Sequence, residues 1–169
     1  MQRRKREAKA KLYDEQVIEI KSVVKVTKGG RQRRFEAVVA VGDRKGKVGL
    51  GIAKAFEIPD AINKAIQSAT KNMIKIPLTD NRTIAHEAKG VCSGARVLLM
   101  PASAGTGVVA GGAVRDILDL VGINDILSKS LGSRTKHNVA LATINALKQI
   151  KTPEEIAALR GKTVEEILE

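Results

Sequence analysis

Aromatic residues are almost missing from this chain of 169 residues, which has no Trp, one Tyr and two Phe. Hydrophobic residues make up 43% of the chain, so a core is expected, and it must be built from aliphatic side chains and alanine. Proteins that bind single-stranded nucleic acids usually stack the bases on aromatic side chains. The shortage of aromatic residues therefore excludes a stacking platform of that kind.

Cysteine, histidine and long apolar runs are also scarce. Cys92 is the single cysteine, which excludes an internal disulfide framework and predicts a reducing compartment, the cytoplasm. His86 and His137 have no cysteine or acidic partners at metal-ligand spacing, so no metal site is predicted. No apolar run approaches the ~20 residues that cross a bilayer, and no apolar segment follows the basic start. Neither a membrane span nor a signal peptide is expected.

The glycine-rich stretch Gly105–Gly112 precedes a helical pattern, an arrangement that can hold a phosphate on free N–H groups. The Lys-Ser/Thr pair of a P-loop is replaced by Ala113-Val114, and Gly105-x-Gly107 is followed by Val108-Val109-Ala110, which lacks the third glycine of the dinucleotide pattern. We therefore predict no catalytic residue, no cofactor and no small-molecule substrate. A phosphate- or nucleotide-binding enzyme domain that uses this stretch stays open as the alternative.

Positive charge is what the chain has in excess, with 30 Lys and Arg, 18 Asp and Glu, and a net charge of +12. Residues 1–80 carry 19 basic and 9 acidic residues, whereas residues 81–169 carry 11 and 9. This excess indicates a polyanionic partner that lies mainly against the first half. No helix-turn-helix or zinc pattern for reading a DNA groove is visible. We therefore expect folded RNA, recognised through its backbone, shape and 2′-hydroxyl groups.

Residues 28–51 read KGGRQRRFEAVVAVGDRKGKVGLG. Apolar residues alternate from Phe35 to Val41, and a glycine turn with basic neighbours lies at each end. This pattern predicts a β-hairpin whose glycines let the backbone approach a partner closely. The residues predicted to bind RNA are Lys25, Lys28, Gly29, Gly30, Arg31, Arg33, Arg34, Arg44, Lys45, Lys47 and Lys54.

The rest of the chain divides into an arm, two folding units and a tail. Residues 1–11 are basic and nearly free of apolar residues, which predicts a disordered arm that either folds on RNA or only aids solubility. Residues 12–78 predict a three-stranded antiparallel sheet with one helix that begins near Pro59. Residues 79–152 predict strands over 83–90, 96–100 and 125–131, a helix that ends at Gly122, and a helix capped by Asn138. Residues 153–169 predict a short helical tail.

Two long motifs stand out in this arrangement. The first runs Gly29-Gly30-Arg31-x-x-x-Phe35-x-Ala37-Val38-Val39-Ala40-Val41-Gly42-Asp43-x-x-Gly46-x-Val48-Gly49-x-Gly51. The second runs Pro101-Ala102-Ser103-x-Gly105-Thr106-Gly107-x-x-Ala110-Gly111-Gly112-Ala113, and the chain closes on Arg160-Gly161-Lys162-x-Val164-Glu165-Glu166-Ile167-Leu168. In this order the motifs resemble those of bacterial small-subunit ribosomal protein five, and the resemblance extends over nearly the whole chain from about residue 12.

The resemblance implies a fold of the α+β class. The N-terminal domain would be similar to a double-stranded-RNA-binding domain, with a three-stranded antiparallel sheet and one helix. The C-terminal domain would have the βαβ-containing fold named after this family. Proteins of the family are structural constituents of the small ribosomal subunit and not enzymes.

The resemblance also implies partners and residue roles. The partners would be small-subunit ribosomal RNA near the central pseudoknot, small-subunit ribosomal proteins four and eight, and messenger RNA nearby at its entry channel. Val24, Lys25 and Val26 match a loop where spectinomycin resistance arises. Gly107 and Arg115 match positions where substitutions alter decoding accuracy. Support of subunit assembly and decoding would be the function, and an RNA chaperone outside the ribosome stays open as another interpretation.

Overall fold

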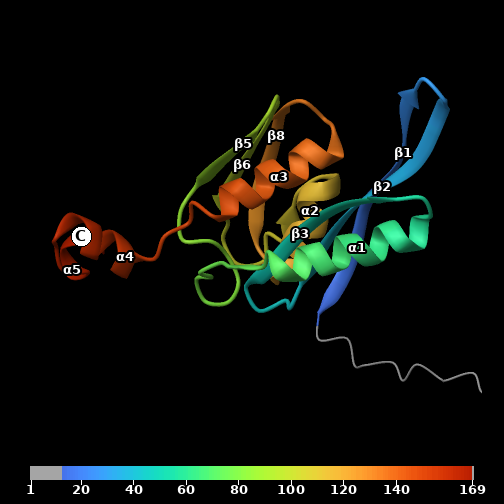
Figure 1. Ribbon diagram of the computed structural model, residues 1–169. Coiled ribbons are helices and arrows are strands. Elements are labelled where there is room, and N and C mark those ends of the chain that lie inside the picture. Colours follow the sequence, from blue (N-terminus) through green and yellow to red (C-terminus); the bar gives the residue numbers. More distant parts are fainter. Residues whose placement is uncertain (1–12, 169) are drawn as a thin grey trace, which may run out of the picture.

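The computed structural model describes residues 13–168, so the predicted arm at residues 1–11 lies outside the described part. The first sheet is antiparallel and has four strands in the order β1-β2-β3-β4, with helix α1 packed on one face (Figure 1). Three strands were predicted, and the two-residue strand β4 adds the fourth. The elements are β1 (Asp14–Thr27), β2 (Gly30–Gly42), β3 (Lys47–Ala55), α1 (Ile58–Lys71) and β4 (Ile74–Lys75).

The second sheet has the order β5-β6-β8-β7. Strand β7 runs parallel to β8, and α2 connects them, so the predicted βαβ unit is confirmed. The elements are β5 (Ala88–Cys92), β6 (Ala95–Pro101), β7 (Val108–Val109), α2 (Gly112–Val121), β8 (Ile126–Gly132) and α3 (Lys136–Leu147). Gly122 ends α2 in the left-handed conformation at φ 89°, as the sequence predicted.

Two predicted boundaries in this part were wrong. The strand expected over 83–90 begins only at Ala88, because the preceding backbone bonds elsewhere: Asn124 and Asp125 donate N–H groups to the Arg82 carbonyl, and Thr79 pairs with Thr83. The helix expected to be capped by Asn138 begins at Lys136, with Thr135 at the N-cap position and no side-chain cap. Local propensity did not reveal these backbone partners, which come from distant segments.

The inner half of strand β2, residues 37–42, is buried on both faces. Ala37, Val39 and Val41 face α1, whereas Val38 and Ala40 belong to a second apolar cluster that includes Leu120 of α2. Helices α2 and α3 therefore lie between the two sheets (Figure 1). This cluster contains residues from both sides of the predicted domain boundary near residue 79. Because the two units share one core, packing does not mark where one ends, and the predicted domain bounds stay a prediction.

Helices approach both sheets closely where glycine meets alanine. Gly49 and Gly51 of β3 face Ala65 and Ala69 of α1, and a Cβ at Gly51 would overlap the Ala65 carbonyl oxygen. Gly90 of β5 has the same relation to α3, where Ala142 and Ala146 face it. Each helix thus packs on strand backbone that no side chain holds away.

The turn between β2 and β3 closes the C-terminus of α2. The Arg44 N–H donates to the Leu120 carbonyl at 3.0 Å, and the Gly46 N–H donates to the Val121 carbonyl at 2.9 Å. Carbonyl groups in the last turn of a helix have no partner within the helix. The first folding unit therefore caps a helix of the second, which fixes the two units against each other.

The C-terminal segment lies to one side of this body, as Figure 1 shows. It comprises α4 (Pro153–Arg160) and α5 (Glu165–Leu168). A reciprocal capping box starts α4, because Thr152 accepts the Glu155 N–H and the Glu155 carboxylate accepts the Thr152 N–H. The predicted helical tail is thus present in the described residues. None of the helices within residues 13–168 is long and apolar enough to cross a bilayer.

Candidate nucleic-acid interface

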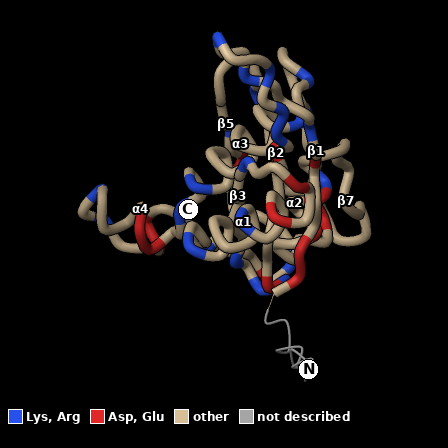
Figure 2. Tube along the Cα trace, turned by 45° about the vertical axis from the view of Figure 1, so that its right-hand side comes forward, with Lys and Arg blue, Asp and Glu red and all other residues tan. Residues whose placement is uncertain are grey.

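The outer half of the β1–β2 hairpin forms a basic arm, which we define as residues 21–35. It carries six basic side chains and no acidic one, namely Lys21, Lys25, Lys28, Arg31, Arg33 and Arg34. Figure 2 shows Lys and Arg along this half, whereas acidic residues lie toward the start of β1. The sequence predicted the cations, and the structure projects them from a two-stranded ribbon beyond the end of α1 (Figure 1).

Strand alternation distributes these cations over both faces of the arm. Arg31 and Arg33 pair with Val26 and Val24, while Arg34 and Gln32 pair with Val23 and Lys25 on the opposite face. Two guanidinium groups lie over aromatic rings: Arg33 is 5.4 Å from the Phe35 centroid, and Arg34 is 4.6 Å from the Phe56 centroid. The few aromatic residues here thus orient arginines.

A hollow of about 310 Å³ lies where the arm meets the body, lined by Val23, Val24, Lys25, Gln32, Arg34 and Lys54. Lys54 is 3.5 Å from the Glu36 carboxylate, and its side chain is half exposed. This concave surface brings three of the predicted RNA-binding cations together. It suits a polyanion better than a neutral ligand, because Lys25, Arg34 and Lys54 outnumber the single carboxylate beside them.

The two predicted glycine turns differ in what surrounds them. At the tip of the arm, a Cβ on Gly29 or Gly30 would meet nothing within 4 Å, so this backbone is open to an external partner. At the other turn, a Cβ on Gly42 would overlap the Leu120 carbonyl, and one on Gly46 would lie 3.0 Å from the Ile76 oxygen. The second turn is close to this protein's own backbone, so its glycines are accounted for by packing.

The second turn nevertheless displays its cations. Arg44 forms an ion pair with Asp14 at 2.7 Å while its side chain is 68% exposed, and Lys45 and Lys47 are exposed. Asp43 accepts the N–H groups of Lys45 and Lys47, which holds the turn rigid. The two glycine turns lie at opposite ends of β2, which at about 3.3 Å per residue places the turns roughly 40 Å apart.

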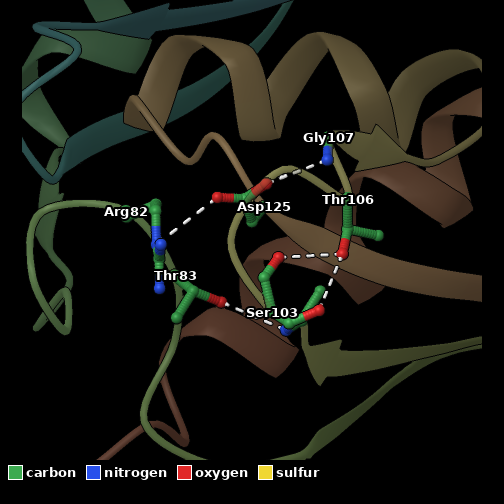
Figure 3. A network of polar contacts seen from close by, with 7 residues as sticks. Arg82, Thr83, Ser103, Thr106, Gly107 and Asp125 are labelled. Carbon is green, nitrogen blue, oxygen red and sulfur yellow. Dashed lines mark hydrogen bonds and ion pairs between the residues drawn. The ribbon is translucent and has the colours of Figure 1, made fainter.

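The glycine-rich stretch of the second unit is held by a buried carboxylate (Figure 3). Asp125, whose side chain is 6% exposed, accepts the Gly107 N–H at 2.9 Å. Its other oxygen lies 3.4 Å from Arg82 Nε, an ion pair without hydrogen-bond geometry. Ser103 and Thr106 close the turn between them. Sequence reasoning missed Arg82 and Asp125, because no motif connects residues 43 positions apart.

This geometry argues against the phosphate-binding alternative. A phosphate loop presents free N–H groups to an anion, but here the Gly107 N–H already donates to Asp125. The carboxylate would also repel a phosphate at this position. Among residues 13–168, no group of three or more His, Cys, Asp and Glu side chains is placed to hold a metal ion.

Gly107 and Arg115 lie on either side of the N-terminus of α2. Gly107 has φ 77° and open space around it, and Arg115 is exposed with Asp119 at 3.9 Å. In the helix, directly after Arg115, burial raises the pKa of Asp116 above its ordinary value of 3.8, and the neighbouring Asp119 charge adds to the shift. This surface also exposes Val109 and belongs to the second folding unit, apart from the basic arm.

Replacing Asp116 by Asn is expected to raise the free energy of unfolding at neutral pH by less than about 0.5 kcal/mol, since Asp116 is only partly buried and solvent still screens its charge. A raised pKa in the folded state means that ionisation costs stability, and this cost disappears below pH 3.8, where both states are protonated. Urea unfolding of D116N and the natural chain should therefore differ at neutral pH and agree near pH 3. A difference of the same size at both pH values would contradict this assignment.

An α+β body that extends a basic, two-stranded arm is typical of proteins that bind nucleic acid. Comparison with known families agrees with this class: residues 13–77 match the ribosomal protein S5 N-terminal domain, and residues 90–160 match the ribosomal protein S5 C-terminal domain. The chain belongs to the ribosomal protein S5 family.

Membership confirms the predicted family and fold class. It makes the chain a ribosomal protein of the small subunit that binds ribosomal RNA. The family is one of structural proteins, and the chain is ribosome-associated. The residues that contact RNA, and the proteins beside it, are treated below as proposals.

Proposed function

We propose that the basic arm is the main RNA-binding element of this chain and positions it in the small subunit. The observation that carries the proposal is the run of six basic residues over residues 21–35, displayed on both faces with no acidic residue between them. A ribbon of this kind fits between two RNA segments, because each face offers cations to a different phosphate backbone. Open glycine backbone at the tip allows close approach.

Arg44, Lys45 and Lys47 form a second RNA contact in this proposal, with Lys54 between the two clusters. Their exposed side chains extend from a turn that Asp43 and the end of α2 hold rigid. Charged turns roughly 40 Å apart at the two ends of β2 would span more than a single RNA helix. The chain would then fix the relative position of RNA segments, which is how we propose that it supports subunit assembly.

The surface from Gly105 to Arg115 is proposed to meet a protein neighbour. By analogy with the family we propose small-subunit ribosomal protein four as this neighbour, with protein eight as a further neighbour and messenger RNA nearby. Support comes from the open space around Gly107 and from the exposed position of Arg115. On the same analogy we propose that this surface contributes to decoding accuracy, and that Val24, Lys25 and Val26 lie in the spectinomycin-resistance loop.

The arm proposal predicts a change in the salt dependence of RNA binding. Replacing Lys25, Arg31, Arg33 and Arg34 by Gln in the full chain should lower the slope of log K against log salt by about 3, since each phosphate contact contributes about 0.7–0.9. Binding to small-subunit ribosomal RNA would be measured by filter retention between about 50 and 300 mM KCl.

A matched control removes the same charge elsewhere, with Lys148, Lys151, Arg160 and Lys162 replaced by Gln. This variant should keep the slope of the natural chain. Equal slopes in the two variants would mean that net charge alone determines binding, and the arm proposal would be wrong.

Sedimentation tests the interpretation as an RNA chaperone outside the ribosome, because a chaperone would not migrate in a fixed ratio with small subunits.

A further inference from the structure

Strands β5, β6 and β8 have one face covered by α3 and the core, and one face open. On the open face, three exposed or half-buried aliphatic side chains alternate with three basic ones: Val91, Leu98 and Leu131 with Lys89, Arg96 and Lys129. The half-buried pair Met100 and Leu127 continues the same face in the next row. We call the first six residues the outer sheet face. Nothing in the RNA-binding proposal uses it.

The strand register arranges this face as a checkerboard. One row across the sheet reads Val91, Arg96, Leu131, and the next reads Lys89, Leu98, Lys129. Directly opposed side chains on one face of a sheet lie about 5 Å apart, so each aliphatic residue has cations as neighbours. Val91 and Leu131 are 54% and 49% exposed, and the face contains a hollow of about 400 Å³.

The charges on this face have one sign. The three strands contain no Asp or Glu, and the Glu87 carboxylate beside them lies 3.7 Å from Lys89 in an exposed pair that contributes little. An occupant must therefore supply negative charge. It must also cover aliphatic side chains, because an exposed apolar hollow rimmed by polar residues is typical of a protein-binding surface.

From these observations we propose that the outer sheet face binds another protein of the small subunit and not a second copy of this chain. The segment that binds would have aliphatic side chains flanked by Asp or Glu. RNA fits the face less well: it would pair with the cations but leave the aliphatic centre against phosphate and sugar, with no aromatic residue to stack a base. This docking proposal does not depend on the basic arm or on the Gly105–Arg115 surface. From the proposed function it takes only that the chain is part of the small subunit.

Photo-crosslinking in assembled small subunits tests the proposal directly. A benzophenone amino acid replaces Leu131 in the full chain, and the same replacement at Val26 on the arm serves as a reference that reports RNA. We expect the group at position 131 to join another small-subunit protein at an acidic, aliphatic segment identified by peptide mapping. An adduct with RNA, an adduct between two copies of this chain, or no adduct at position 131 would overturn the proposal.

The two positions keep this proposal separate from the proposed function. An RNA adduct at position 26 bears only on the arm, and the result at position 131 decides the docking partner whatever position 26 gives. Replacing Lys89, Arg96 and Lys129 by Glu should lower the yield of the protein adduct at least tenfold, because opposed like charges weaken association. An unchanged yield in a folded variant would refute the acidic character of the partner.

Discussion

Replacing Gly51 by Ala is expected to destabilise the protein by about 3–5 kcal/mol, a large part of the 5–15 kcal/mol typical of a folded domain. A Cβ at this position would overlap the Ala65 carbonyl oxygen and lie 2.6 Å from the Ala69 nitrogen. Both obstacles are helix backbone, so no side chain can rotate away to make room. Helix α1 would have to move off the sheet and open the cluster around Ala37 and Val39.

Urea unfolding followed by circular dichroism measures this loss as a lower midpoint. The matched control is Gly29→Ala, because a Cβ at Gly29 would meet nothing within 4 Å. Gly90→Ala should behave like Gly51→Ala, since Ala142 and Ala146 stand against Gly90 in the same way. If Gly51→Ala and Gly29→Ala unfolded at the same urea concentration, the close packing of helix on strand would have no energetic weight.

The glycines show where sequence reasoning reached its limit. In the sequence, Gly29, Gly42, Gly46 and Gly51 belong to one motif beside basic residues, and close approach to RNA was predicted for the turns at both ends. The structure separates them: Gly29 is open, whereas Gly42 and Gly51 meet the backbone of α2 and α1. Glycine indicates close approach from sequence alone, but only coordinates tell whether the approaching group is internal or external.

The elements themselves were largely predictable. Alternation of Phe35, Ala37, Val39 and Val41 predicted β2, and Gly122 correctly marked the end of α2. The second buried face of β2 was missed, although residues 37–41 read AVVAV without a polar residue, a pattern typical of a strand covered on both sides. Short strands such as β4 carry too few residues to show any period.

The candidate interface was predictable in content and less so in geometry. The basic residues of the arm could be named from sequence, and period-two alternation assigns them to faces once the register with β1 is known. The partners of Arg33 and Arg34, Phe35 and Phe56, were not foreseen. Contacts between distant segments, such as Arg82 with Asp125, leave no local pattern to detect.

Replacing Asp125 by Ala is expected to lower the free energy of unfolding by about 3 kcal/mol, since it removes one partner of a buried ion pair and a charged hydrogen-bond acceptor. The Gly107 N–H would lose its acceptor, and Arg82, about a third exposed, would keep a partly desolvated charge without its carboxylate. Urea unfolding measures the loss. Asp119→Ala is the matched control, because its carboxylate is 55% exposed and lies 3.9 Å from Arg115, and it should cost less than about 0.5 kcal/mol.

A third variant, Asp125→Asn, separates the hydrogen bond from the ion pair. Asp125→Asn retains an oxygen that accepts the Gly107 N–H but gives up the charge that faces Arg82, so it should lose less stability than Asp125→Ala. Hydrogen exchange of the Gly107 amide should be faster in Asp125→Ala and nearly unchanged in Asp119→Ala, because only the first removes its acceptor. Unchanged exchange in both would mean that the carboxylate does not hold the glycine-rich stretch in place, and that the shape of the surface next to Arg115 is set elsewhere.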